Sequence, residues 1–110
     1  MAYYLFQGAY TPESWAAQLK NPQNRAEVIR PLLERVGARL EALYYAFGAD
    51  DVVAIVEAPD NISASSLALA VTASGAFKAF RTTPLMTVDE GIAAMRKAAE
   101  ASASYRPPTA

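Results

Sequence analysis

Segments rich in aromatic and aliphatic residues alternate along the chain with segments that begin with helix-capping residues. The first segment, Ala2–Ala9, is rich in tyrosine, leucine and phenylalanine, which is typical of a β-strand. Thr11 followed by Pro12 predicts a helix that ends near Lys20, because threonine caps helix N-termini and proline suits the first helical position. A strand followed directly by a helix is therefore expected at the start of the chain.

A second helix is predicted from the same cap-then-proline signal at Asn21 and Pro22. Its apolar residues fall on one helical face, at Ile29, Leu32, Leu33 and Val36. Gly37 follows as a plausible C-terminal cap. Pro31 lies inside the pattern, so we expect a kink or a break there.

Two apolar segments, Arg39–Phe47 and Asp51–Ala58, flank the turn-forming sequence Gly48-Ala49-Asp50. Such a short connection between two strands predicts a β-hairpin. Asp60 or Asn61 then provides the cap of another helix.

That helix is predicted over Ile62–Ser74 and ends at Gly75, and a fourth strand is predicted over Phe77–Met86. Thr87 and Glu90 match a capping box, in which each side chain reaches a backbone N–H of the other residue. A last helix follows to about residue 101.

The order β-α-β-β-α-β plus a C-terminal helix predicts an α+β, ferredoxin-like domain with a four-stranded antiparallel sheet and helices on one face. A single domain is expected over residues 1–101, and residues 102–110, which contain Pro107-Pro108, are expected to form a disordered tail. Helices on one face leave the other face of an apolar sheet open to water. Because large exposed apolar faces are unfavourable, we expect a homo-oligomer, a dimer or higher, in which a second copy covers this face.

The residue types present narrow the possible chemistry. The chain has no cysteine and no histidine, which excludes disulfides, thiolate nucleophiles, imidazole bases and zinc sites built from these residues. The net charge of −1 offers no bulk attraction to nucleic acid or to an anionic membrane. With no signal peptide and no long apolar run, a cytoplasmic protein without a metal or cofactor is expected.

Several sequence stretches together resemble the GYD-domain family. They are YLFQGAYTPESW at the start, the segment from NPQNRAEV to VEAPD, and TTPLMTVDEG near the end, and the resemblance covers roughly residues 3–95. The resemblance implies a fold like that of the dimeric α/β barrels, and it implies little about activity. The Gly-Tyr-Asp signature of the family corresponds here to Gly48-Ala49-Asp50-Asp51, in which the tyrosine is missing.

The candidate ligand-binding residues are charged or aromatic side chains on the predicted strands and turns. Glu57 ends an apolar strand, where a carboxylate acts either as a ligand-binding group or general base, or as a structural partner of an arginine or backbone N–H. Arg81 lies inside the fourth strand and could bind an anionic group or pair with a carboxylate. Asp51, beside Asp50, could bind a cation, although an ordinary turn role fits it better.

Four aromatic residues complete the candidate set. Tyr44 and Tyr45 are adjacent on a strand and must point to opposite faces, so that one of them, with Tyr4 or Phe6, could line a cavity between paired sheets. Tyr10 and Trp15 flank the first helix start. For all four, plain packing is the alternative to ligand binding.

Three hypotheses about function follow. The first is a homo-oligomeric binding or regulatory module that holds a small, partly aromatic or acidic ligand. The second is a cofactor-independent enzyme, of the monooxygenase, isomerase or decarboxylase type, that uses Glu57, a tyrosine and Arg81. The third is a structural assembly protein without a ligand. The narrow catalytic repertoire favours the first.

Overall fold

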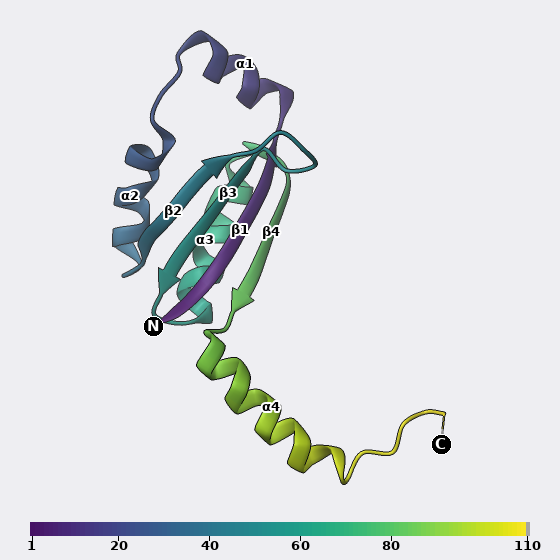
Figure 1. Cartoon of the computed structure of the whole chain (residues 1–110). Coiled ribbons are helices and arrows are strands. Elements are labelled where there is room, and N and C mark those ends of the chain that lie inside the picture. The colour runs from purple at the N-terminus through teal and green to yellow at the C-terminus, as the bar shows by residue number, and fades with distance from the viewer. Residues whose placement is uncertain (110) are drawn as a thin grey trace.

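The computed structural model describes residues 1–109 and contains four strands and four helices (Figure 1). In chain order these are β1 (Ala2–Tyr10), α1 (Pro12–Lys20), α2 (Arg25–Arg35), β2 (Arg39–Tyr45), β3 (Val52–Ala58), α3 (Asn61–Ala73), β4 (Phe77–Leu85) and α4 (Val88–Ser102).

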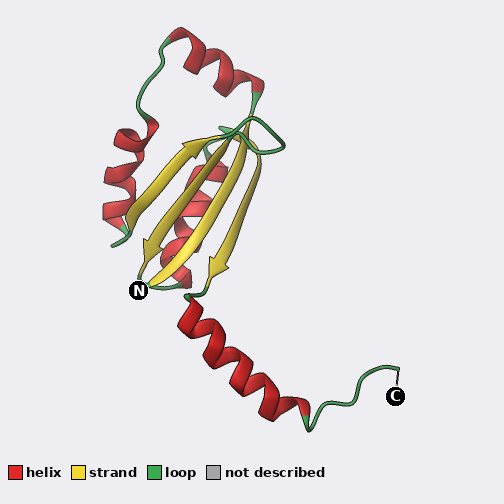
Figure 2. Cartoon of the chain, viewed as in Figure 1, coloured by secondary structure: helices red, strands yellow, loops and turns green. Residues whose placement is uncertain are grey.

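The strands form one antiparallel sheet in the order β2-β3-β1-β4. This is the ferredoxin-like arrangement, so the predicted fold class is confirmed. β1 and β3 are the central strands, and they are paired in register from Ala2 opposite Ala58 to Gly8 opposite Val52. Figure 2 shows the four strands as one layer with α3 behind it.

The core lies on one side of this sheet, between the strands and α2 and α3; we call this side the helix face. Alternate residues of β1 and β3 point into it, including Tyr4, Phe6 and Val56, and all three are buried. Leu33 of α2 and Leu67 of α3 pack against them. The opposite side of the sheet, the open face, is covered by no element among residues 1–109.

The second helix differs from its predicted form in two ways. It begins at Arg25 and not at Pro22, because Asn24 is the residue whose side chain accepts hydrogen bonds from the first free backbone N–H groups, those of residues 26 and 27. Pro31 neither breaks nor ends it. Pro31 and Glu27 are both exposed, so water can hydrate the Glu27 carbonyl that loses its helical partner.

The other predicted helix ends match the structure within one or two residues. Thr11 caps α1 and Asp60 caps α3, where the Ser63 N–H donates to Asp60 Oδ1 at 2.8 Å. Thr87 and Glu90 form the capping box of α4. Gly37 has a φ of +72° where α2 ends, a conformation that suits a residue without a Cβ.

The strand ends and the tail were predicted less closely. β2 ends at Tyr45 and β3 begins at Val52, so the connection is longer than the turn read from Gly48-Ala49-Asp50. Residues 103–109 are exposed and form no helix or strand. Disorder of residues 102–110 stays a prediction; residue 102 is the last of α4, and residue 110 lies outside the described residues.

Two β-bulges bring apolar residues onto the helix face. In β4, Phe77 pairs with Tyr10 and Phe80 with Gly8, with an irregularity between Ala9 and Tyr10. Residues three apart in a regular strand point to opposite faces, and the extra residue lets both rings reach the same face. A second irregularity, between Leu40 and Ala42, does the same for Leu40 and Leu43 in β2.

We predict that Gly8→Ala destabilises the domain by about 1–3 kcal/mol, the usual cost of overpacking a core. A Cβ at this buried position would lie 2.6 Å from two ring carbons of Phe77, so the ring would have to move. Urea unfolding followed by circular dichroism measures the change. Gly48→Ala is the matched control, since nothing lies within 4 Å of a Cβ there, and it should change stability by less than about 0.5 kcal/mol. Equal midpoints for the two variants would contradict the prediction.

Candidate functional site

A cavity of about 90 Å³ lies on the helix face, between the sheet and helices α2 and α3. This volume is several times the roughly 10–15 Å³ that a single water molecule needs. The walls are almost entirely aliphatic and aromatic, and the only charged residue among them is Arg25. Aromatic residues of the wall are Phe6, Tyr10, Phe77 and Phe80.

The four aromatic rings form a continuous wall. Tyr10 stacks on Phe77 with ring centroids 4.5 Å apart, Phe77 meets Phe80 edge-on at 5.1 Å, and Phe80 lies 5.6 Å from Phe6. The bulge in β4 produces this wall, because it turns Phe77 and Phe80 to the same side. Gly8 leaves room for the rings above the sheet. One side of the cavity is therefore an aromatic surface suited to a planar group.

Polar groups occur at one end of the cavity. Arg25, the first residue of α2, is half-buried beside the Tyr10 hydroxyl group. Burial raises the pKa of Tyr10, as does nearby Tyr45, while Arg25 acts in the opposite direction. Tyr10 is therefore a neutral phenol at physiological pH, able to donate a hydrogen bond next to a guanidinium group.

Asp51 fixes the position of Tyr10. Its Oδ2 atom accepts a hydrogen bond from the Tyr10 backbone N–H at 2.9 Å and one from the indole Nε1 of Trp15 at 3.3 Å. Trp15 in turn packs edge-on against the Tyr10 ring, with centroids 5.1 Å apart. Three of the predicted site residues thus come together at the end of the cavity. Among them only Tyr10 lines it.

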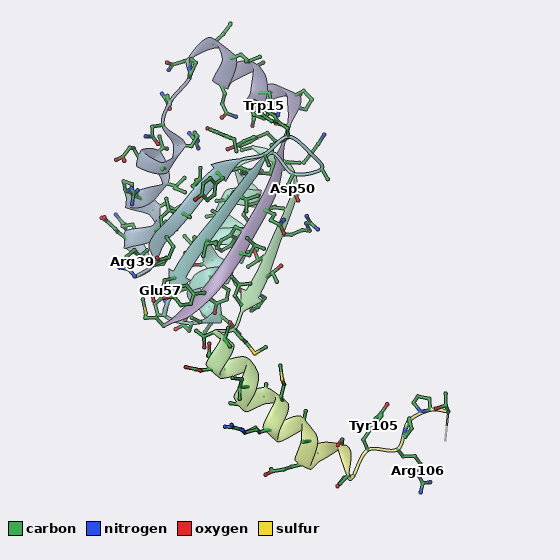
Figure 3. All side chains as sticks on the ribbon, in the orientation of Figure 1. Trp15, Arg39, Asp50, Glu57, Tyr105 and Arg106 are labelled. Atoms are coloured by element: carbon green, nitrogen blue, oxygen red, sulfur yellow. The ribbon has the colours of Figure 1, made fainter. Side chains whose placement is uncertain are left out.

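Glu57 lies on the open face, close to Arg39 (Figure 3), and does not line the cavity. Its Oε1 atom is 3.1 Å from Nη2 of Arg39, and the same guanidinium group lies 2.6 Å from Glu41. The Tyr3 hydroxyl donates a hydrogen bond to Glu57, which together with the negative charge of that carboxylate raises the pKa of Tyr3. The carboxylate is 17% exposed and has arginine as its partner, which is the structural role considered for it.

Arg81 also lies on the open face, at the opposite end of the sheet. It forms an ion pair with Asp50, which also accepts a long hydrogen bond of 3.5 Å from Gln7 Nε2. Arg81 lies opposite Gln7 and Glu57 opposite Tyr3, so the two are separated by four residues of β1, or about 13 Å. The structure does not bring Glu57 and Arg81 into one site.

Tyr44 and Tyr45 point to opposite sides of the sheet, as their adjacency requires. Tyr44 pairs with Val53 on the open face and is 68% exposed, whereas Tyr45 pairs with Val52 on the helix face near Tyr10. Tyr4 and Phe6, considered above as lining between paired sheets, point into the core. Tyr3 and Leu5 lie on the open face of β1 instead, because successive side chains of a strand point to opposite faces and Tyr4 and Phe6 point into the core.

Sequence reasoning missed the residues that form most of the cavity. Arg25 was not among the candidate residues, because a one-dimensional pattern does not show that α2 starts beside Tyr10. Phe77 and Phe80 were read only as strand residues. Their spacing of three within one strand was a usable signal, since two large apolar residues at odd spacing indicate either two buried faces or a bulge.

The described part of the chain offers no alternative metal or membrane feature. Within residues 1–109 there is no group of three or more acidic side chains placed to hold a metal ion. None of the helices over the same residues combines the length and the hydropathy that crossing a bilayer requires.

Comparison with known proteins supports the fold and identifies the family. A crystal structure titled MtbAldR superposes with a TM-score of 0.56 at 16% sequence identity, over 78% of this chain. The matched part is 53% of that other chain, so this protein corresponds to about half of its length, and the likeness concerns the fold alone. No curated protein sequence matches. The GYD domain matches residues 4–95, and the chain therefore belongs to the GYD-domain family.

Proposed function

We propose that this protein is a homo-oligomeric binding or regulatory module that holds a small molecule in the cavity between the sheet and helices α2 and α3. The observation that carries the proposal is the cavity itself, which has aromatic walls and a single cation, Arg25, at its polar end. Binding sites for small molecules are typically apolar hollows with a few placed polar groups.

The cavity interrupts the close packing that is usual in protein interiors, and it opens to solvent beside Arg25 and Leu32. Ala54 and Val71 line the cavity, and larger side chains at these two positions would fill it. A bound molecule that restores the lost contacts is a physical reason for such a void to persist.

The lining indicates the chemistry of the ligand. A planar ring fits against Phe77 and Phe80, and a carboxylate or other anionic group on that ring would reach Arg25 and the Tyr10 hydroxyl. The volume accommodates a ring-sized group, so a larger ligand would extend past Arg25 and Leu32, which both reach solvent. An aromatic carboxylic acid is the simplest compound with these properties.

The oligomer forms, in this proposal, through the open face. Its centre is apolar, with Leu5, Val53 and Ile55 only partly exposed, and its arginines, Arg39 and Arg81, pair with carboxylates of the same chain. The face is therefore close to neutral, and a second copy meets little repulsion there. Burial of such a surface against its own copy is the simplest way to remove it from water.

The alternative functions draw less support from the geometry. The enzyme hypothesis relied on Glu57, Arg81 and a tyrosine, but Glu57 and Arg81 lie at opposite ends of the open face with their charges already paired. The hypothesis of an assembly protein without a ligand needs a filled core. The cavity argues against it.

The first test measures binding of benzoate, with benzene as the uncharged probe. We expect Arg25→Met to weaken benzoate binding about 10- to 100-fold, since a hydrogen bond to a charged group contributes about 1.5–3 kcal/mol, and to leave benzene binding unchanged. Shifts of amide signals in NMR titrations give both affinities.

The matched control for this test is Arg30→Met. Arg30 is exposed on the same helix and pairs with Glu27 at 3.6 Å, outside the cavity. Native mass spectrometry of freshly purified protein adds an independent readout, because a retained ligand appears as extra mass that denaturation removes. No shift with either probe, together with no retained mass, would contradict the binding proposal.

The second test concerns the open face. Ile55 lies at its centre, between Leu5 and Ala42, and we expect Ile55→Arg to convert the oligomer into a monomer by placing a charge in the contact. Sedimentation equilibrium measures the mass, and far-UV circular dichroism confirms that the variant folds. Ser65→Arg, on the exposed side of α3, is the control that should remain oligomeric. A wild-type mass of 11.8 kDa at micromolar concentration would refute the oligomer.

A further inference from the structure

Helix α4 extends away from the rest of the protein. It follows β4 after only Met86 and Thr87 and continues beyond the end of the sheet, with its side chains standing clear of the domain (Figures 1 and 3). None of its residues is buried, and it makes no extensive contact with any other element over residues 1–109. The radius of gyration is 17.7 Å, against about 13 Å for a compact domain of this length.

The sequence of α4 is that of a helix which packs against something. Val88, Ile92, Met95 and Ala99 recur at spacings of four, three and four, which places them on one side of the helix. Val88 and Met95 are 80% and 70% exposed, and Ile92 is 40% exposed. We call these four residues the α4 stripe.

Such a helix needs a partner to be stable. Isolated helices of about 15 residues are marginal in water, and most of their stability in proteins comes from packing of the apolar side. The capping box of Thr87 and Glu90 fixes where α4 starts, so that the helix begins just beyond the end of the sheet. The chain's own core already has its helices, α2 and α3.

We propose that α4 is an arm whose stripe packs against a second copy of this chain, so that two protomers exchange arms. The inference rests on the proposed oligomer and specifies which segment completes it. The arm leaves β4, an edge strand of the sheet whose open face is uncovered. A second copy on that face is close to the base of the arm.

The area needed for a stable dimer supports arm exchange. Four strands about 4.8 Å apart and seven to nine residues long give the open face a footprint of roughly 400–600 Å². A stable interface buries about 800 Å² on each partner. A 15-residue helix is about 22 Å long and 10 Å wide, so each exchanged arm adds roughly 200 Å² to both partners. Two reciprocal arms therefore enlarge the contact between copies toward the area that a stable interface buries.

The charges of α4 favour a protein partner over a lipid surface. The helix carries three acidic residues, Asp89, Glu90 and Glu100, against two basic ones, Arg96 and Lys97. Helices that lie in membrane interfaces are typically rich in lysine and arginine on the polar side and in tryptophan, phenylalanine or leucine on the other. The α4 stripe has valine, isoleucine, methionine and alanine, which suit close packing on a protein surface.

Paramagnetic broadening in mixed samples tests the proposal on the full chain. The protein has no cysteine, so Ala94→Cys gives a single attachment point for a nitroxide spin label on the side of α4 opposite the stripe. Spin-labelled protein at natural isotope abundance is mixed with ¹⁵N-labelled wild-type protein. Broadening of ¹⁵N amide signals then reports contact between two different chains. We expect at least a twofold loss of intensity at a contiguous group of residues in the body of the ¹⁵N-labelled copy.

Two variants make the test specific. Ile92→Glu with Met95→Glu places charges on the stripe, and introducing both changes into the spin-labelled chain should abolish the broadening. Ala101→Glu adds a charge on the opposite side of α4, away from the stripe, and should preserve the broadening. The double variant should also weaken dimerisation at least tenfold in sedimentation experiments.

The outcomes separate this proposal from that of the oligomer. A dimer without intermolecular broadening would overturn the exchanged arm and leave the dimer standing. A further sample contains a chain that carries both the spin label and ¹⁵N, diluted into unlabelled protein. Broadening that occurs only in this sample would show that the arm folds back on its own domain, and this result would also overturn the exchanged arm. A monomer at every concentration would refute both proposals, and benzoate binding would still be tested independently.

Discussion

The centre of this protein's sheet is apolar on both sides, and its two core helices lie on only one of them. α2 and α3 cover Tyr4, Phe6 and Val56, while Leu5, Val53 and Ile55 on the other side have no covering element in the described chain. The alternation of side chains along β1 and β3 makes this unavoidable, because each strand contributes equally to both faces. The uncovered face, and with it the proposed oligomer, follows from this mismatch between two apolar faces and one layer of helices.

The cavity on the other side depends on a smaller feature, the bulge in β4. Without the extra residue, Phe77 and Phe80 would point to opposite sides of the sheet, and the stack of Tyr10 on Phe77 could not form. Gly8 is the complementary element, because a side chain there would occupy the space of the Phe77 ring. The aromatic wall therefore results from one added residue in β4 and one missing side chain in β1. Arg25 reaches its end because Asn24, and not an earlier residue, caps α2.

Local patterns predicted the fold well, whereas they predicted little of the site. Capping by Thr11, Asp60 and Thr87 depends on neighbours within three residues, so the sequence contains the whole signal. The ion pair of Glu57 with Arg39 joins β3 to β2, and that of Arg81 with Asp50 joins β4 to the connection between β2 and β3. Both pairs depend on a strand register that one sequence does not fix. Tyr10 ends β1 and Arg25 begins α2. The two residues come together only because of the course that the chain takes through α1 and into α2. As a consequence, the candidate residues lie on both sides of the sheet: Glu57 and Arg81 are on the open face, and Tyr10 is on the helix face.

The proposed ligand site and the proposed contact between copies lie on opposite faces of the same strands. In β1, Tyr4, Phe6 and Tyr10 face the core while Tyr3 and Leu5 face outward, and β4 carries Phe77 and Phe80 before it leads into the arm. Phe77 begins β4, and α4 follows the other end of the same strand. If binding there changes the affinity between copies by some factor, association must change ligand affinity by the same factor, since the two free energies are linked. In the proposed module such a coupling would run through the strands that both faces share, since β1 and β4 contribute residues to each of them.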